Sequence, residues 1–375
     1  MSVIINGTDG VTFNDASLQG AAASPYVLKN RIINGDMRID QRNAGASVTV
    51  NSNSQNFYDV DRFYGIAQSA DGVFTLQQNT SVPTGQGFVN SMKVTITTAD
   101  ASIGATQQYY IAQEVEGYNV ADLQYGTANA KTVTLSFWVN CSVTGTFSGC
   151  FMNSASDRSY PFTYTISSAN TWEQKTITIA GDTTGTWNST NGTGISVQWS
   201  LGSGSSRSST ANTWGAGRYH GATGATALIS TNGATFYITG VQLEQNTSAT
   251  PFERRLYNQE LANCQRYYQR VKAEGAGSRF YILQCPTTTQ AEGVLFYKQT
   301  MRVAPAALEQ SGTAGDYSVD SANVTTTCSV VPTFGLATTD SIYITATVAS
   351  GLTAGRAGSL RAVNANAYFG WSAEL

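Results

Sequence analysis

Charged side chains are scarce in this sequence. Asp, Glu, Lys and Arg make up 12% of its 375 residues, about half of the roughly 25% that is usual for soluble domains. The basic residues are scattered, and the net charge is -3. Nucleic acid is not expected as a partner, because phosphate binding needs clustered Lys and Arg. Solubility must come from Ser, Thr, Asn and Gln, and a hydroxyl-rich composition favours exposed β-sheets.

Long apolar runs are missing as well. No stretch approaches the roughly 20 apolar residues that cross a membrane, so membrane insertion is not expected. Residues 1–5 contain no basic start followed by a long apolar run, so no secretory signal is expected either. A protein that is made in the cytoplasm and acts elsewhere after cell lysis satisfies both observations.

Few residues are suited to catalysis or metal binding. His220 is the sole histidine, and a Ser-His-Asp or Cys-His site would have to use it. A lone histidine in a loop is more often solvated or hydrogen-bonded, and no Gly-x-Ser-x-Gly or phosphate-binding loop occurs. The cysteines fit no zinc spacing. We expect free, mostly buried thiols, with a Cys141–Cys150 hairpin bridge as the alternative; the five are Cys141, Cys150, Cys264, Cys285 and Cys328.

Paired carboxylates are the remaining route to an enzyme, through hydrolysis of glycosidic bonds. Asp59 and Asp61 would share one face of a strand, and we expect them to pair with Arg62 or Arg42 instead. No enzyme is therefore expected, and a polysaccharide depolymerase is the least favoured function. The other candidate carboxylates are Glu114, Glu116, Asp157, Asp182 and Glu244.

The chain from 30 to 250 has the pattern of many short strands. Apolar side chains alternate with Thr, Ser and Trp over 133–139, and Ile195, Val197 and Trp199 share one face. Period-two patterns separated by Gly- and Asn-rich turns predict an antiparallel sandwich. In residues 236–243 the apolar positions switch from even to odd across Gly240, which predicts a bulge or kink there.

A short helix is predicted to follow Pro251 and Phe252. Its apolar stripe recurs at spacings of 4, 3 and 4, and the members are Tyr257, Leu261, Cys264 and Tyr268. The stripe either packs on the chain's own sandwich or lines an oligomer or domain interface. Residues 251–272 are thus a linking helix. Strand patterns resume after it, so 273–375 is expected to be a second, small β domain.

Tryptophan is the residue most suggestive of a ligand. Trp199 is predicted to lie in the core, whereas four other tryptophans lie on the opposite strand face or beside turns. Exposed rings next to Asn, Gln and Ser suit a sugar, whose C–H face stacks on a ring while its hydroxyls meet amides and hydroxyls. The alternative is that they cap the sandwich or lie at subunit contacts. These candidate glycan ligands are Trp138, Trp172, Trp187 and Trp214.

Several segments together resemble a module that recurs in phage and prophage tail proteins, over roughly residues 30–270. Asn34-Gly-Asp-Met37 is similar to the opening of jelly-roll carbohydrate-binding modules, and 236–243 is similar to their closing strand. The other segments are 30–37, 40–42, 58–63, 133–138, 169–175, 236–253 and 264–268.

The resemblance implies an all-β fold with a jelly-roll β-sandwich over 30–250. Such modules often carry a structural calcium near the paired first and last strands. Their closing strand typically supplies acidic residues where this chain has Thr239-Gly240. No cofactor is therefore expected, and Asp36 is the residue that would contribute to a calcium site.

The resemblance also implies a phage virion protein, assembled in the host cytoplasm. Residues 1–29 are expected to dock onto other virion proteins through the extended pieces at 3–5 and 11–13, and a disordered terminus is the alternative. The favoured function is a homotrimeric tail fibre or similar appendage that recognises host surface polysaccharide by multivalent contacts. The alternative is a capsid decoration or head-fibre protein with a structural role.

Overall fold

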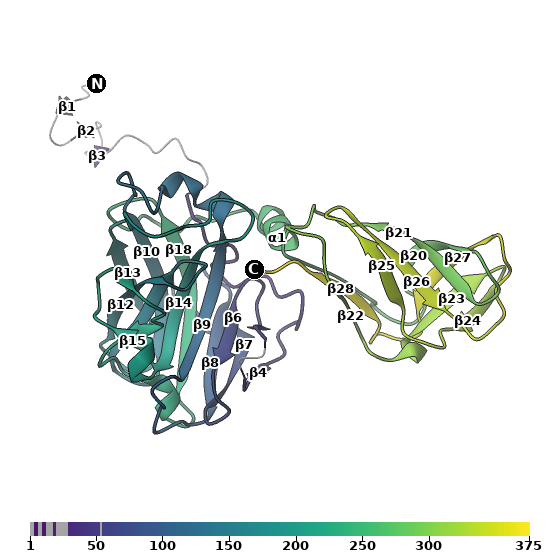
Figure 1. Ribbon diagram of the computed structural model, residues 1–375, viewed down its shortest axis with the longest axis horizontal. Coiled ribbons are helices and arrows are strands. Elements are labelled where there is room, and N and C mark those ends of the chain that lie inside the picture. The colour runs from purple at the N-terminus through teal and green to yellow at the C-terminus, as the bar shows by residue number, and fades with distance from the viewer. Residues whose placement is uncertain (1–3, 7–9, 13–17, 20–28, 53–54) are drawn as a thin grey trace.

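The protein consists of two β lobes joined by one short helix (Figure 1). The structure is a computed structural model, and it describes residues 4–6, 10–12, 18–19, 29–52 and 55–375. The predicted all-β class, with antiparallel sandwiches and one short helix, is confirmed. No helix within these described ranges is both long and apolar enough to cross a membrane.

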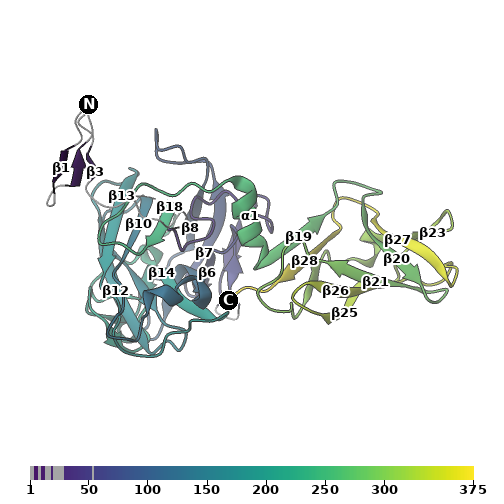
Figure 2. The same ribbon diagram turned by 90° about the horizontal axis from the view of Figure 1, so that it is seen from above.

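The larger lobe is a sandwich of two main antiparallel sheets (Figures 1 and 2). The first has six strands, in the order β13 (Glu173–Ile179), β10 (Val133–Cys141), β18 (Thr235–Glu244), β8 (Ser91–Thr98), β7 (Val73–Asn79) and β4 (Val48–Val50). The second has seven, in the order β16 (Gly215–Ala216), β12 (Arg158–Ile166), β11 (Gly145–Met152), β14 (Thr193–Ser203), β9 (Gln108–Glu116), β6 (Tyr64–Ala67) and β5 (Phe57–Tyr58). Short β15 (Ser208–Ser209) pairs in parallel with β17 (Gly221–Ala222).

The apolar side chains of the alternating strands fill the space between the two sheets. Phe137 of β10 and Trp199 of β14 are both fully buried, and their ring centroids lie 5.7 Å apart in an edge-to-face contact. Burying side chains of this size supplies the main driving force for the sandwich. All five cysteines are buried and free, so the expected free thiols are confirmed and the Cys141–Cys150 bridge is wrong.

The smaller lobe packs a seven-stranded sheet against a three-stranded one. The seven strands run β24 (Val324–Thr327), β23 (Tyr317–Ser321), β27 (Arg356–Ala362), β20 (Arg279–Cys285), β21 (Gln290–Phe296), β26 (Ser341–Thr347) and β25 (Thr333–Ala337). The three run β19 (Tyr268–Lys272), β28 (Tyr368–Ser372) and β22 (Leu308–Gln310). Phe280 and Phe369 join the two sheets, with ring centroids 4.9 Å apart.

Short single-turn 3-10 helices occur in the connections. They are η1 (Gly117–Asn119), η2 (Ala121–Leu123), η3 (Ser205–Arg207), η4 (Leu228–Ser230) and η5 (Ala314–Asp316). Near the N-terminus, β1 (Ile4–Asn6), β2 (Gly10–Thr12) and β3 (Leu18–Gln19) form a small antiparallel sheet. The two extended pieces predicted for docking therefore pair with each other, and the rest of residues 1–28 lies outside the described residues.

The linking helix is shorter than predicted. Helix α1 spans Tyr257–Gln265, and Tyr268 begins strand β19 instead of a fourth helical position. Tyr268 pairs with Ser372 in a five-residue ladder between β19 and β28. The spacing of 4, 3 and 4 fitted a helix, but pairing with the distant last strand overrides that local pattern.

Asp59 and Asp61 do not lie in a strand, contrary to the prediction. They occupy the turn between β5 and β6, and both are fully buried. Asp61 accepts hydrogen bonds from the backbone and side chain of Gln41. Arg62 and Arg42, the two expected partners of these aspartates, both form their ion pairs with Glu374 near the C-terminus instead.

Candidate functional site

A pocket of about 640 Å³ lies on the outer face of the six-stranded sheet. Trp138 of β10 is opposite Gln174 of β13, and Ser136 is opposite Thr176. Residues that are opposite one another in an antiparallel ladder share a face of the sheet, so these four side chains form the floor. We call it the Trp138 pocket; its lining is Gln86, Phe88, Ser136, Trp138, Gln174, Thr176, Gly240, Ala249, Thr250, Pro251, Phe252 and Arg254.

A β-bulge at Gly240 shapes this floor. Ser136 pairs with Gln242 and Trp138 pairs with Thr239, so Gly240 and Val241 stand opposite the single residue between them. This confirms the bulge predicted from the parity switch. Gly240 has φ +62, and a Cβ there would lie 2.6 Å from Cζ of Phe88. The glycine thus lets Phe88 and Trp138 approach the same stretch of backbone.

Replacing Gly240 with alanine is expected to lower the unfolding free energy by roughly 1–3 kcal/mol, because the new methyl meets Phe88 in a left-handed backbone conformation. Urea denaturation measures the loss. Gly233→Ala is the matched control, since Gly233 has φ +75 with nothing within 4 Å of its added Cβ. Equal losses in the two variants would show that the contact with Phe88 contributes nothing.

The walls of the Trp138 pocket come from two loops that Arg254 fastens together. Arg254 donates to the carbonyl oxygens of Gly87, at 2.9 Å, and Gln86, at 2.5 Å. Its guanidinium lies 4.7 Å from the ring centroid of Phe88 and 5.7 Å from that of Phe252. The two rings meet edge to face at 5.2 Å. The guanidinium is therefore already engaged, and the remaining polar groups of the pocket are uncharged amides and hydroxyls.

Trp172 lies on the same sheet face beyond the pocket. It immediately precedes β13 and packs edge to face on Tyr237 of β18, with ring centroids 6.2 Å apart. Tyr237 is opposite Asn140, two residues along β10 from Trp138. Two residues along a strand span about 7 Å. The half-buried rings of Trp138, Trp172 and Tyr237 therefore form an interrupted aromatic track along one face.

Trp187 and Trp214 lie elsewhere, in a ring cluster around Tyr125. Their centroids are 5.0 and 5.9 Å from that of Tyr125. Trp214 donates to the carbonyl of Ala180 at 2.7 Å, and Trp187 lines a separate pocket of about 380 Å³. The structure thus brings two of the four predicted tryptophans to one face. The sequence pattern did not point to Phe88 or Phe252, although Pro251 before Phe252 was a turn signal.

A smaller pocket of about 180 Å³ contains His220 and Glu114. His220 is hydrogen-bonded through Nδ1 to Gln198 at 2.7 Å and stacks on Tyr110. Burial, with Arg218 and Arg207 nearby, lowers its pKa to about 3, so it is neutral at physiological pH.

Glu114 in the same pocket accepts hydrogen bonds from Tyr64 at 2.6 Å and Ser196 at 2.7 Å, and burial raises its pKa. It is the one carboxylate side chain among the described residues that line this pocket. Other candidate carboxylates are held by basic or polar partners. Glu116 pairs with Arg266, Asp182 with Arg158, Asp157 accepts from Asn153, and Glu244 accepts from Thr250.

The residues predicted for an interface pack largely within the chain. Leu261 and Cys264 contact Ile33 and Ile39, which precede the first strand of the sandwich. The hydroxyl of Tyr268 donates to Glu309 at 2.7 Å inside the smaller lobe. Tyr257 alone of the four is exposed. Within one chain the stripe therefore joins the two lobes.

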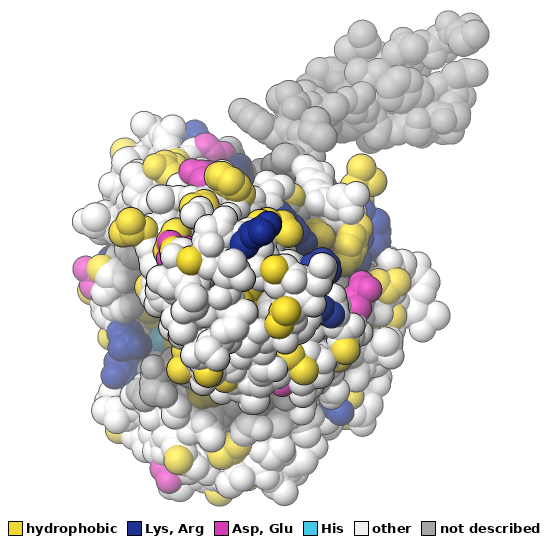
Figure 3. All heavy atoms as spheres, turned by 90° about the vertical axis from the view of Figure 1, so that its right-hand side faces the viewer, with side chains coloured by type: hydrophobic (Ala, Val, Ile, Leu, Met, Phe, Trp, Pro, Cys, Tyr) yellow, Lys and Arg dark blue, Asp and Glu magenta, His cyan; other side chains and the backbone are white. Residues whose placement is uncertain are grey.

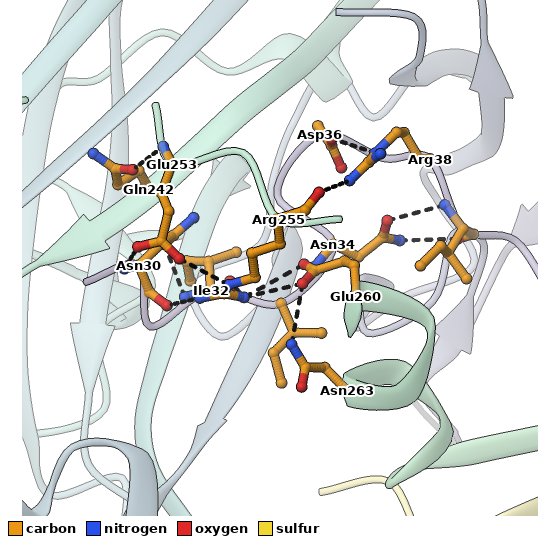
Figure 4. Close-up of polar contacts among 12 residues, drawn as sticks. Asn30, Ile32, Asn34, Asp36, Arg38, Gln242, Glu253, Arg255, Glu260 and Asn263 are labelled. Atoms are coloured by element: carbon orange, nitrogen blue, oxygen red, sulfur yellow. Dashed lines mark hydrogen bonds and ion pairs between the residues drawn. The ribbon is translucent and has the colours of Figure 1, made fainter. Parts of the chain in front are cut away.

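Asp36, the residue considered for calcium, is paired with Arg38, whose Nε lies 2.5 Å from its carboxylate. Among the described residues no group of three or more His, Cys, Asp or Glu side chains is arranged to hold a metal ion. The charged residues around Asp36 are shown in Figure 4.

Comparisons with known proteins show distant structural likeness alone. No family model matches the chain, and no curated protein matches it. The enzymatically active domain of tailspike protein 4 of bacteriophage CBA120 is similar with a TM-score of 0.30 and 13% identity. That match covers 60% of this chain and 22% of the tailspike chain, so this chain spans about a fifth of it.

Carbohydrate-binding modules have a similarly low structural likeness to this chain. A family 4 module has a TM-score of 0.28 and 16% identity, covering 57% of this chain and 98% of that one. The family 11 module of a Clostridium thermocellum cellulase has a TM-score of 0.26 and 10% identity, covering 54% of this chain and 96% of that one. Because these structural similarities are so low, they carry no argument about the site, which rests on this chain's own residues.

Proposed function

We propose that the Trp138 pocket binds a saccharide unit, and that the protein is a phage virion component, a tail fibre or similar appendage, which recognises host surface glycan. The observation that carries the binding half is the half-buried Trp138 ring set beside the amides of Gln86 and Gln174. A ring offers a stacking face for sugar C–H groups, and amides serve hydroxyls both as donors and as acceptors.

The preferred ligand is a neutral glycan of several units. Arg254 is the one charged residue among the described lining residues, and its guanidinium is engaged by two carbonyls and two rings. Binding should therefore depend little on salt. The track from Trp138 to Trp172 and Tyr237 favours a chain that extends along the sheet.

Purified protein applied to glycan arrays and to whole host cells tests the binding half. We expect weak, multivalent binding to a subset of neutral polysaccharides, with little change between low and physiological salt. Absence of binding to both arrays and cells would end the receptor proposal. Labelling of intact particles tests the virion half, which rests on the sequence resemblance, and distinguishes a tail location from a capsid one.

We further propose that the protein binds glycan without cleaving it. None of the described residues that line the Trp138 pocket is Asp or Glu, whereas hydrolysis uses a pair of carboxyl groups across the scissile bond. Polysaccharide incubated with the protein should keep its chain length, as measured by size-exclusion chromatography. Shortening of the polymer would support the depolymerase alternative.

The outer face of the smaller lobe supports self-association. Ile282 of β20, Val294 and Phe296 of β21, and Leu336 of β25 are all large, apolar and exposed. Val294 is opposite Tyr343 of β26. Because these side chains are uncharged, copies of the patch can meet without like-charge repulsion. Figure 3 views the molecule from the far end of the smaller lobe, where uncharged surface dominates and charged side chains form small groups. We propose that a second and a third copy of the chain cover this apolar face in a homotrimer.

Phe296→Asp is expected to reduce the solution mass from an oligomer to a monomer, because Phe296 is 80% exposed within this patch and a buried charge at an interface is costly. Multi-angle light scattering at about 10 µM protein measures the mass. Val324→Asp, at an exposed position of edge strand β24, is the control and should leave the oligomer intact. A monomeric unsubstituted protein would contradict the proposal.

A further inference from the structure

A cluster of opposite charges is buried where residues 29–34, the chain that leaves strand β18 and helix α1 meet (Figure 4). Its centre is Arg255, whose side chain is 8% exposed. The Nε of Arg255 donates to Oε1 of Glu253 at 3.0 Å, and Nη1 lies 3.1 Å from Oε2 of Glu260. Both carboxylates are nearly buried.

Backbone carbonyls complete the surroundings of the guanidinium. Nη1 of Arg255 donates to the carbonyl oxygen of Ile32 at 3.1 Å, and Nη2 donates to the carbonyl of Asn30. Two carboxylates and two carbonyls therefore converge on one cationic group. The planar fork of a guanidinium can satisfy several such acceptors at once.

The same two carboxylates also fix residues 29–34 beside strand β18. Glu253 also accepts the backbone N–H groups of Lys29, at 2.5 Å, and Asn30, at 3.0 Å. Glu260 accepts the N–H of Asn34. Arg31 then donates its N–H to the carbonyl of Leu243 in β18 at 2.8 Å. The cluster thus joins residues 29–34, the 249–255 loop and α1 into one unit.

The oxygen set is of the kind that a calcium ion takes, since carboxylates and carbonyls are its preferred ligands. A divalent cation does not fit here, because the guanidinium of Arg255 fills the space between these oxygens. The nearby Asp36 is neutralised by Arg38, which also donates to the carbonyl of Arg255 at 3.0 Å. Three carboxylates are thus set against two guanidinium groups.

We propose that Arg255 is a built-in replacement for a structural divalent cation, and that removing its side chain turns the cluster into a calcium-binding site. With Arg255 present, the fold needs no metal. Without it, Glu253 and Glu260 remain buried with no counter-charge, a costly arrangement that a bound cation relieves.

Thermal unfolding of the full chain, with EDTA or with about 10 mM calcium chloride, tests the proposal. The Tm of the unsubstituted protein should be the same in both. Arg255→Ala should lower the Tm in EDTA by roughly 10 °C, and calcium should restore at least about 3 °C by mass action. Arg254→Ala is the matched control, because it removes a neighbouring positive charge outside the cluster and should show no calcium response.

Arg255→Lys separates charge from geometry. A lysine keeps a positive charge, so the Tm should fall because the fork is lost, and calcium should again have no effect. The proposal is overturned by a calcium-sensitive Tm in the unsubstituted protein, or by an Arg255→Ala variant that calcium does not stabilise. An Arg255→Ala variant that folds neither in EDTA nor in calcium would also overturn the proposal, because calcium would then fail to replace the guanidinium.

Discussion

Glu374→Gln is expected to lower the unfolding free energy by about 3–5 kcal/mol, because it leaves buried arginine side chains without their counter-charge. Arg62 is 2% exposed and forms an ion pair with Glu374, which is 5% exposed. Arg42 lies 3.2 Å from the other carboxylate oxygen. Glutamine keeps the shape of the side chain but removes the negative charge that both guanidinium groups face.

The substitution should also uncouple the two lobes. Glu374 follows β28 of the smaller lobe, whereas Arg42 and Arg62 belong to the sandwich, and the chain end lies between the lobes in both ribbon views (Figures 1 and 2). Arg302 of the smaller lobe donates to the carbonyls of Ala373 and Glu374, each at 2.7 Å, and also to the carbonyl of Asn191 in the sandwich at 2.7 Å, so it ties the chain end to both lobes. Losing the central charge therefore weakens the contact between the lobes more than either core.

Differential scanning calorimetry measures this effect. We expect one transition in the unsubstituted protein and two in Glu374→Gln, with the lower one several degrees below the original. Asp122→Asn is the control, since its pair with Arg31 is partly exposed and surface ion pairs contribute at most about 1 kcal/mol. If Glu374→Gln unfolds like Asp122→Asn, the C-terminal contact does not hold the lobes together.

Local patterns predicted the sandwich well, because each strand face depends on residues two apart. The parity switch across Gly240 even located the bulge, since an extra residue must reverse which side chains point inward. The end of helix α1 was not predictable in this way. Its limit at Gln265 follows from pairing of Tyr268 with Ser372, about a hundred residues later in the chain.

The site was predictable only in part, for a related reason. Trp138 stands in the Thr and Ser series of an alternating strand, and that position marks a ring on the outer face. Phe88 and Phe252 come from loops far apart in sequence, and they meet because Arg254 ties both loops together. The neighbouring Arg255 gave no sign of its separate role, since its partners at Asn30 and Ile32 are more than two hundred residues away.

Trp138→Ala is expected to weaken glycan binding by about 30-fold or more, because a central stacking ring typically contributes at least about 2 kcal/mol. Trp138 is the largest ring in the pocket and stands between Gln174 and the bulge at Gly240. Trp138→Tyr keeps a stacking face and should lose less. Isothermal titration with a polysaccharide identified on the arrays measures each affinity.

Trp187→Ala is the matched control for this loss, because it removes the same side chain from a different pocket. Its affinity should stay within about twofold of the unsubstituted protein. Trp172→Ala should fall between the two if the ligand extends along the sheet toward Tyr237, since its ring lies on the same face beyond the pocket. Equal binding by Trp138→Ala and Trp187→Ala, with both variants folded by their Tm, would remove the Trp138 pocket as the glycan site.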